Sequence, residues 1–269
     1  MTMYKALAVA GSDTSGGAGL QADLKTFQEL GVYGMTAITV IVAQNPDNNW
    51  AHDIYPLSLD VLEAQLETVL KGIGVDALKT GMLATTETID LVANKIDAYH
   101  VKNVVIDPVM ACKGTDEVLH PETAEAIAKV LAPRATVLTP NLFEASQLSG
   151  IKEIHSLDAL KEAAQKIYAL GTKNVLIKGG AKLGTPTAID LFYDGKEFVV
   201  LESPKFEQAY THGAGCTYGA AITAGLAKGL TAKEAVQAAK VFISKAIEHS
   251  FPLNQYVGPT CHAAHRLYK

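Results

Sequence analysis

The chain has 269 residues, of which 48% are hydrophobic, and a formal net charge of −5. This length and composition can bury the core of one large α/β domain or of two small ones. The negative charge excludes a broad basic surface for nucleic acid or for an anionic membrane, so a site for a polyanion must be a local pocket.

Cysteine usage and hydropathy indicate the compartment. The three cysteines, Cys112, Cys216 and Cys261, are far apart and match neither a zinc pattern nor a disulfide framework. The N-terminal apolar run is too short for a signal peptide and is typical of a first strand. No apolar run reaches the roughly 18 residues that a membrane span needs. We therefore expect a cytoplasmic protein with neither a membrane nor a nucleic acid as partner.

Apolar runs of strand length alternate with helical patterns along most of the chain. Strands are expected in residues 5–11, 37–44 (fully buried and parallel), 76–81, 103–108, 135–141 and 174–180. Helices are expected in residues 17–31, 58–72, 86–100, 121–133, 156–171, 215–228 and 231–249. Ser58 is a candidate N-cap and Gly31 a candidate C-cap. Two alternating runs in 188–203, joined by Asp194-Gly195, predict a hairpin.

Repeated strand–helix units predict one α/β domain over residues 1–269. Its central sheet is expected to be mostly parallel, covered by helices on both faces, with an antiparallel addition late in the chain. Ligands of such sheets bind at the carboxyl ends of the strands. Polar and glycine residues follow six predicted strands in succession, in GSDTSGGAG, AQN, KTGM, DPVMACKG, TPNLFE and KGG. These ends predict a shared crevice.

The first of these loops allows two other interpretations. Residues 17–22 match the G-x-G-x-x-A variant of the dinucleotide fingerprint, which would indicate an oxidoreductase. That interpretation needs an acidic residue near the end of the second strand, and residues 36–44 contain none. A flexible glycine loop without a ligand is the other alternative. A Walker A pattern is absent.

The stretch THGAGCT, residues 211–217, predicts an anion site. Gly213, Ala214 and Gly215 bring unpaired backbone N–H groups to the start of a predicted helix, where the helix dipole also favours negative charge. Cys216 would then face a transferring phosphoryl group. The alternative for Cys216 is a small buried hydrophobe in an ordinary helix.

Asn141 and Glu144 stand three residues apart, one helical turn, so both can reach one point. A carboxylate and an amide near phosphates suit Mg²⁺, which usually keeps several waters. The alternative is an N-cap asparagine followed by an ordinary first-turn glutamate.

Taken together, these motifs resemble the ribokinase-like superfamily. They resemble more closely its branch of hydroxymethylpyrimidine and phosphohydroxymethylpyrimidine kinases of thiamine synthesis, with their pyridoxal kinase relatives. The resemblance covers residues 10–217 and is carried, in order, by AGSDTSGGAGLQADLKTF, KTGM, DPVM, TPNLFEA, KGG and THGAGCT. It implies a three-layer α/β/α sandwich in which ATP, with Mg²⁺, phosphorylates a small heteroaromatic alcohol. It also implies a homodimer.

The resemblance assigns roles by position. Gly213, Ala214 and Gly215 form the anion hole, and Cys216 takes the place where most of the superfamily has an aspartate base. A helix N-terminus lowers the pKa of a thiol from about 8.5, but ATP phosphates raise it, so the protonation state of Cys216 stays open. Asn141 and Glu144 match the family's motif for Mg²⁺ and phosphate. The positions implied for the nucleotide are Thr139, Asn141, Lys178, Gly179, Gly180, Thr211 and Ala238.

The substrate positions implied are Gly11, Ala18, Asp23, Gln44, Met82 and Val109. Asp23 has the alternative of a solvent-facing residue on the first helix, and Met82 that of simple pocket wall. Cys112, Lys113 and Gly114 fall in a segment that is a mobile lid in this branch. Cys112 is a candidate for reversible addition to an aldehyde such as pyridoxal, with an ordinary exposed thiol as the alternative.

Gln44 is the position that bears on the substrate. Its carboxamide can pair in two-point fashion with an exocyclic amine and the adjacent ring nitrogen, an edge that the aminopyrimidine presents and pyridoxal does not. A strand-end glutamine bonded to backbone is the alternative. VAQN resembles the thiamine-pathway enzymes, whereas LNQYVGP and NNWAHD resemble pyridoxal kinases that also accept the pyrimidine. We expect a hydroxymethylpyrimidine kinase that also accepts pyridoxal. The alternatives are a pyridoxal or pyridoxine kinase and, in another class, a non-catalytic vitamin-binding protein.

Overall fold

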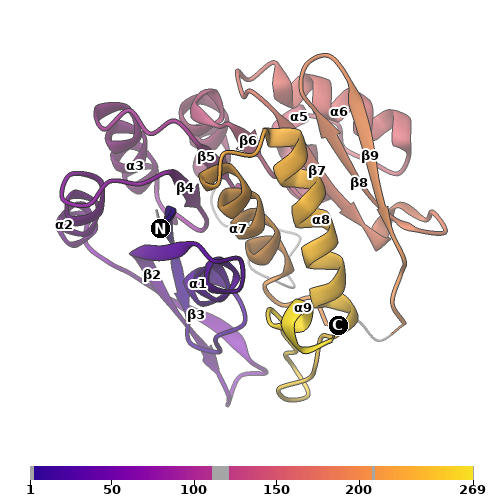
Figure 1. Cartoon of the computed structure of the whole chain (residues 1–269), viewed down its shortest axis with the longest axis horizontal. Helices are drawn as coiled ribbons and strands as arrows, with labels where there is room; N and C mark the ends of the chain where they lie inside the picture. The colour runs from indigo at the N-terminus through magenta and orange to yellow at the C-terminus, as the bar shows by residue number, and fades with distance from the viewer. Residues whose placement is uncertain (1–2, 111–120, 208–209, 269) are drawn as a thin grey trace.

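The computed structural model describes residues 3–110, 121–207 and 210–268 (Figure 1). In these residues nine strands form one sheet in the order β3-β2-β1-β4-β5-β6-β7-β8-β9. The strands are β1 (Lys5–Asp13), β2 (Tyr33–Asn45), β3 (Ala51–Pro56), β4 (Ala77–Thr80), β5 (Val104–Ile106), β6 (Val137–Leu138), β7 (Val175–Gly180), β8 (Ala188–Tyr193) and β9 (Phe198–Ser203).

The α-helices are α1 (Gly19–Glu29), α2 (Leu59–Leu70), α3 (Thr86–Ala98), α4 (Pro121–Ala126), α5 (Leu142–Ser149), α6 (Leu157–Tyr168), α7 (Ala214–Ala227), α8 (Ala232–Glu248) and α9 (Ala264–Leu267). A π-helical turn, η1 (Ile127–Leu131), and two 3₁₀ turns, η2 (Ala132–Arg134) and η3 (Ala181–Leu183), complete the elements. Ser58 is the N-cap of α2, as predicted, and Gly31, with φ +67°, directly follows the C-cap of α1. Among the described residues, no helix combines the length and the apolar character needed to cross a membrane.

The six central strands from β2 to β7 run parallel, while β3, β8 and β9 pair antiparallel with their neighbours. The mostly parallel sheet and the late hairpin are therefore confirmed. Strand β3 was not predicted, because its six residues carry no apolar run and three of them are exposed at the sheet edge. The same edge leaves Ile41 of β2 43% exposed, so the prediction that residues 37–44 are fully buried was wrong.

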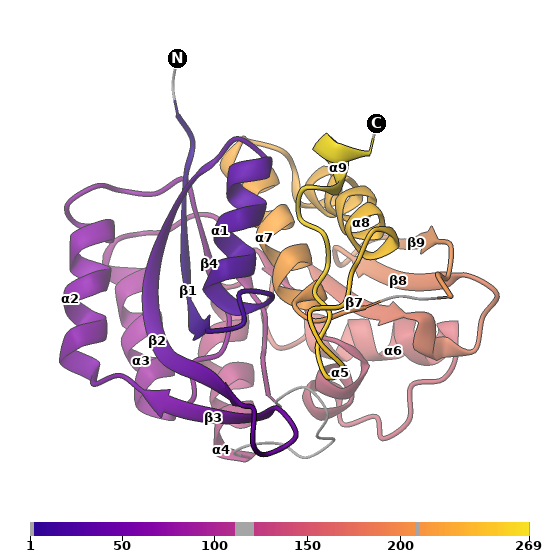
Figure 2. The ribbon, with the colours of Figure 1, turned by 90° about the horizontal axis from the view of Figure 1, so that it is seen from below.

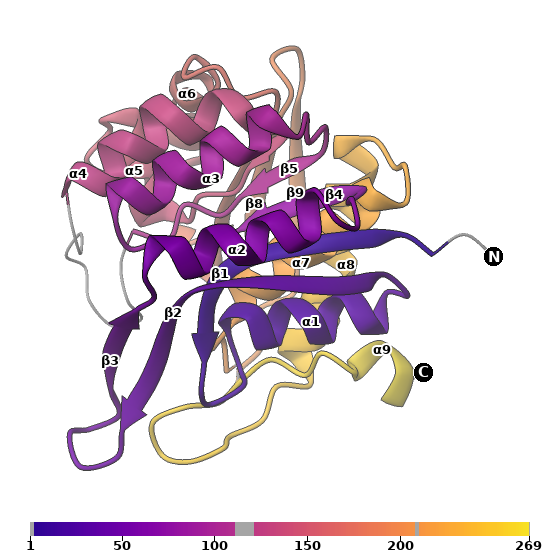
Figure 3. The ribbon, with the colours of Figure 1, turned by 90° about the vertical axis from the view of Figure 1, so that its left-hand side faces the viewer.

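Two hydrophobic cores flank the sheet and make a three-layer α/β/α sandwich, as expected. Alternation along β1 sends Leu7 and Val9 to the core beneath α2, α3, α5 and α6, and sends Ala6 and Ala8 to the core beneath α1, α7 and α8. Figure 3 shows α2, α3, α5 and α6 on one side of the strands and α1 on the other.

The parallel strands point their carboxyl ends to one edge of the sheet, and α7 begins at that edge. Figure 2 shows the ends of β1 and β7 approaching the start of α7. An isolated bridge pairs Asn141 with Lys178, which joins the loops after β6 and β7. The topology thus brings most of the predicted site residues to one place.

Candidate active site

The start of α7 forms an open cradle of backbone N–H groups. Gly213 is its N-cap, with φ +75°, and makes no side-chain capping bond. The Ala214 N–H donates to the Thr211 carbonyl oxygen at 3.1 Å, so the prediction that it is unpaired was wrong, and the N–H groups of Gly215 and Cys216 are left for an anion. A Cβ on Gly213 would lie 1.8 Å from the carbonyl oxygen of Gly17, so the loop after β1 packs directly against the cradle. Ala214, Gly215 and Cys216 follow in the first turn, all partly exposed. Free N–H groups, small residues and a helix dipole together suit an anion.

Cys216 lies in the first turn of α7, above a group of buried charges. Burial raises the pKa of its thiol to about 11, and the nearby Lys79 ammonium only partly opposes that increase. The raised pKa favours the neutral thiol at neutral pH.

Lys178 places a cation beside the cradle. Its Nζ donates to Asp107 Oδ1 at 2.7 Å and would lie 3.4 Å from a Cβ on Gly215. Burial lowers the pKa of Lys178, but the carboxylates of Asp107 and Glu144 outweigh burial and the pKa is raised. Lys178 thus stays charged next to the N–H groups where phosphate is expected.

The other residues predicted to contact the nucleotide divide into two groups. Gly179 has room for no side chain, since a Cβ would lie 2.4 Å from the Ile189 carbonyl oxygen, and the Gly180 N–H donates to Asp190 at 3.1 Å. Thr211 and Ala238 are exposed and accessible to a ligand. Thr139 is fully buried, and its hydroxyl donates to a backbone carbonyl, so the predicted direct contact does not match this geometry.

Asn141 and Glu144 form a reciprocal capping box at the start of α5. The Glu144 N–H donates to Asn141 Oδ1 at 3.0 Å, and the Asn141 N–H donates to Glu144 Oε2 at 2.8 Å. The alternative of an N-cap with a first-turn glutamate is thus correct as local structure. The Glu144 side chain is also buried beside Lys178 and Asp107, and burial raises its pKa.

The same pair fits a magnesium site. Carboxylate and amide oxygens keep a second lone pair beyond their capping bonds, and hard oxygen donors are what Mg²⁺ prefers. Within the described part of the chain, no group of three or more His, Cys, Asp or Glu side chains could enclose a metal ion. A magnesium ion held by Asn141 and Glu144 would therefore keep waters or phosphate oxygens as its remaining ligands.

Asp13, at the end of β1, accepts most of the hydrogen bonds that hold the loop packed against the cradle. This residue was not among those identified from the sequence. Its carboxylate accepts hydrogen bonds from the backbone N–H groups of Ser15, Gly17 and Ala18 and from the side chains of Ser15, Gln44 and His212. Burial alone would raise the pKa of Asp13, but the bonds from His212, Gln44 and Ser15 outweigh it and hold the pKa well below its usual range. Asp13 thereby ties β2 and the loop before α7 to the first loop.

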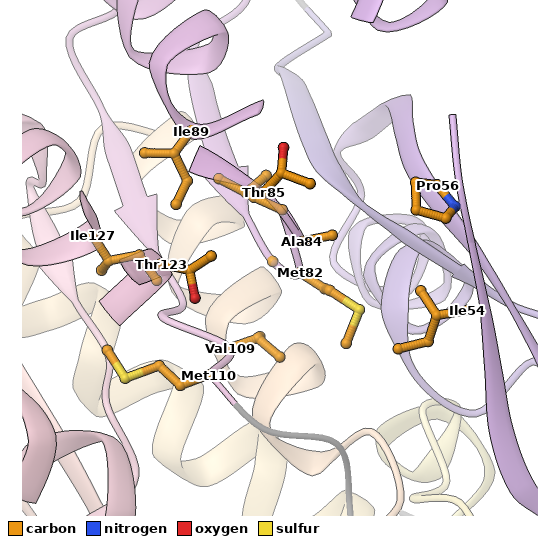
Figure 4. Close-up of a pocket in the computed structure, with 12 residues that line it drawn as sticks. Ile54, Pro56, Met82, Ala84, Thr85, Ile89, Val109, Met110, Thr123 and Ile127 are labelled. Carbon is orange, nitrogen blue, oxygen red and sulfur yellow. The ribbon is translucent and has the colours of Figure 1, made fainter. Parts of the chain in front are cut away.

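Two predicted substrate residues line an apolar pocket of about 240 Å³ at the ends of β4 and β5. Met82 and Val109 both contribute to its wall, facing Ile54 of β3 (Figure 4). Gly11 lies in β1, and a Cβ on it would lie 2.9 Å from a Val40 methyl group. Glycine is therefore needed there for packing against β2, and it has no side chain with which to contact a substrate.

Two other predicted substrate contacts have different partners. Gln44 Nε2 donates to Asp13 Oδ1 at 2.6 Å, which matches neither a free carboxamide nor the alternative of a bond to backbone. Asp23 is fully buried and ion-paired with Lys79, so it is neither a substrate contact in this geometry nor the solvent-facing residue of the alternative. Cys112, Lys113 and Gly114 lie outside the described residues.

Signals for the missed residues were present in the sequence. Asp13 and Asp107 each follow a buried strand, where the strand-end rule already placed ligands. Lys79 interrupts the buried strand Ala77–Thr80, and a lysine at such a position requires a partner. No sequence pattern showed which residues form the ion pairs with these charged side chains.

Proteins of known sequence that resemble this chain are kinases. The sequence model of the phosphomethylpyrimidine kinase family matches residues 13–261. The chain is 61% identical to the pyridoxine kinase of Bacillus subtilis over 99% of this chain and 98% of that protein. It is 42% identical to the hydroxymethylpyrimidine/phosphomethylpyrimidine kinase of Bacillus subtilis over 98% of this chain and 96% of that protein.

Two solved structures are similarly close. The ADP complex of Bacillus subtilis pyridoxal kinase superposes with a TM-score of 0.96 at 61% identity, covering 99% of this chain and all of that one. The Staphylococcus aureus pyridoxal kinase in complex with AMP-PCP and pyridoxal superposes with a TM-score of 0.93 at 48% identity, covering all of this chain and 97% of that one.

Proposed function

The chain belongs to the phosphomethylpyrimidine kinase family and is a kinase, and we propose from this premise that it phosphorylates the hydroxymethyl group of pyridoxal or pyridoxine. This reverses the order expected from the sequence, in which the pyrimidine came first. The higher identity to the pyridoxine kinase, 61% against 42%, supports the reversal. Hydroxymethylpyrimidine is then a secondary substrate.

The observation in the site that carries this choice is the bond between Gln44 and Asp13. An aminopyrimidine needs a carboxamide that presents one donor and one acceptor together. Here the amide nitrogen of Gln44 donates one of its two hydrogens to a buried carboxylate at 2.6 Å. Support of the first loop through Asp13 therefore accounts for Gln44 without a pyrimidine, and the residue by itself no longer favours the pyrimidine as substrate.

ATP is the phosphate donor in this proposal. The relatives hold ADP in one solved structure and AMP-PCP in another. In this chain Lys178 supplies a cation beside the start of α7, where the N–H groups of Gly215 and Cys216 have no acceptor within the helix. Thr211 and Ala238 lie exposed farther out, where they would contact the nucleoside.

Catalysis in this arrangement is mostly positioning and neutralisation of charge. When bound, Mg²⁺ would neutralise negative charge on the phosphates, held by Asn141 and Glu144. The α7 N–H groups and Lys178 would stabilise the equatorial oxygens of the transferring group. Because its raised pKa favours the neutral thiol, Cys216 is not a preformed base. It can act only as a thiolate: the thiol first releases its proton to solvent, and the thiolate then takes the proton of the substrate hydroxyl as that oxygen bonds to the γ-phosphorus and the bond from phosphorus to ADP breaks.

The test is a side-by-side assay of ADP release with Mg-ATP and pyridoxal, pyridoxine, hydroxymethylpyrimidine or its monophosphate. We expect the highest kcat/KM with pyridoxal or pyridoxine, and we expect Gln44→Met to lower kcat/KM for all substrates by a similar factor. A strong preference for the pyrimidines that Gln44→Met removes would overturn the proposal and restore the thiamine assignment. No ADP release with any of these alcohols would favour the non-catalytic alternative.

The remaining expectations from the sequence stay part of this proposal. One sheet that includes strands from β1 to β9 supports a single kinase domain over residues 1–269. The homodimer rests on the family resemblance, and sedimentation velocity would test it. Cys112 would be tested by mass spectrometry of borohydride-treated pyridoxal complexes, in which an unmodified Cys112 would exclude the adduct.

A further inference from the structure

A fully buried lysine lies beneath the active site without a part in the chemistry described so far. Lys79 of β4 and Asp23 of α1 are both 0% exposed, and Lys79 Nζ lies 3.1 and 3.2 Å from the two Asp23 carboxylate oxygens. Burying two charges is costly, and well-packed apolar residues in their place are often as stable or more so. The fold therefore gains little stability from this pair.

Helix α7 is shaped to accommodate this lysine. A Cβ on Gly219 would lie 2.8 Å from Lys79 Cε, so a larger residue there would force the lysine side chain to shift. Glycine inside a helix costs about 1 kcal/mol relative to alanine. Gly219 stands three residues after Cys216, which places both on one face of the helix. At the strand end, a Cβ on Gly81 would lie 3.6 Å from Lys79 Nζ.

The ammonium thus reaches from β4 to the face of α7 that carries the thiol. The two groups are close enough to shift each other: Lys79 lowers the pKa of Cys216, and Cys216 raises that of Lys79. The carboxylates of Asp23 and Asp107 raise the pKa of the thiol. Lys178, from β7, also interacts with Cys216.

We propose that Lys79 and Asp23 are positioning residues that set the electrostatic environment of the Cys216 sulfur. The Lys79 ammonium stabilises the thiolate, and the Asp23 carboxylate destabilises it. This deepens the proposed function, because it sets the fraction of Cys216 that is thiolate, the only form that can take the hydroxyl proton. The Lys79 ammonium stabilises the negative charge on sulfur until the substrate proton arrives and makes the thiol neutral again. The ion pair with Asp23 holds the Lys79 ammonium near Cys216.

The test uses two substitutions that break the same ion pair from opposite sides. The rate at which iodoacetamide alkylates Cys216 is measured from pH 8 to 10.5 without nucleotide, by mass spectrometry of the peptide that contains it. At fixed pH the rate is expected to fall about three- to tenfold in Lys79→Met and to rise about three- to tenfold in Asp23→Asn. A purely structural role would move both variants the same way.

The controls separate this inference from the proposed function. Lys240→Met breaks another buried pair, Lys240 Nζ to Asp190 Oδ2 at 2.7 Å, and should leave the Cys216 titration unchanged. Shifts of the same sign in Lys79→Met and Asp23→Asn, or no shift in either, would overturn the inference. If either single variant does not fold, Lys79→Gln and Asp23→Ser replace the two, with the same opposite shifts expected and the same outcomes overturning the inference. Opposite shifts in a protein without kinase activity would refute the proposed function alone.

Discussion

Gly213 is the residue at which one methyl group is expected to separate the two loops of the site. A Cβ there would lie 1.8 Å from the Gly17 carbonyl oxygen, and the residue has φ +75°. Carbon–oxygen contacts are normally about 3.3 Å or longer, so the loops would move apart by about 1.5 Å. The left-handed conformation adds about 1–2 kcal/mol of strain.

A displacement of on the order of 1 Å in a positioned site costs about 10²-fold in rate. Gly213→Ala is therefore expected to lower kcat/KM at least about 10²-fold in an ADP-release assay. Gly229→Ala is the matched control, because Gly229 follows the other end of α7 with φ +88° and has nothing within 4 Å of its Cβ position. Both variants carry the same backbone strain, worth a few degrees of Tm, but only Gly213→Ala should lose turnover.

The comparison also shows what would refute the reasoning. If Gly213→Ala keeps kcat/KM within about threefold of wild type, the contact between the two loops does not position the reacting groups. If Gly229→Ala loses as much activity as Gly213→Ala, general destabilisation explains both results. A crystal structure of Gly213→Ala should show the shift at Gly17.

Three further predictions concern individual side chains. Cys216→Ala should lower kcat by about 10²-fold or more with little change in the KM for ATP, and an unchanged kcat would exclude the thiol from proton transfer. Glu144→Gln should raise the Mg²⁺ concentration needed for half-maximal activity, whereas Glu234→Gln, in the matching capping box of α8, should affect only Tm. Asp13→Asn should lower the free energy of unfolding by about 1–3 kcal/mol in urea titrations, because the amide replaces one acceptor oxygen with an NH2 group among the N–H donors that bind Asp13. The folded pKa of Asp13 is depressed, so its stabilisation is complete above about pH 4 and is lost as the pH falls; Asp13→Asn should flatten that acid limb.

The layered fold was predictable because buried parallel strands are apolar on both faces and so stand out from the helices between them. The edge strand β3 was not predictable in that way. Ala51–Pro56 packs one face weakly, leaves Tyr55 57% exposed, and owes its strand conformation to six pairings with β2. Pairing of that kind is a tertiary property with no period in the local sequence.

The sequence predicted the loops of the site more completely than the ion pairs between its charged side chains. Glycines and polar residues at strand ends located the cradle, Lys178 and the Asn141–Glu144 box, because backbone geometry requires those residue types locally. Ion pairs depend on residues far apart in sequence: His212 lies 199 positions from Asp13, and Lys79 lies 56 from Asp23. A single sequence cannot show such partners, which is why Asp23 was assigned to the substrate.

The arrangement of these pairs explains how a chain with net charge −5 can present a site for a polyanion. Asp13 with His212, Asp23 with Lys79 and Asp107 with Lys178 each place a carboxylate against a nitrogen group, so no buried carboxylate of the three faces the cradle unmatched. The N–H groups of α7, which no side chain caps, then dominate the local field. Such dipoles are fixed by the fold and need no reorganisation when phosphate arrives. Neutralising one carboxylate should therefore shift nucleotide affinity, while a surface carboxylate removed elsewhere should not.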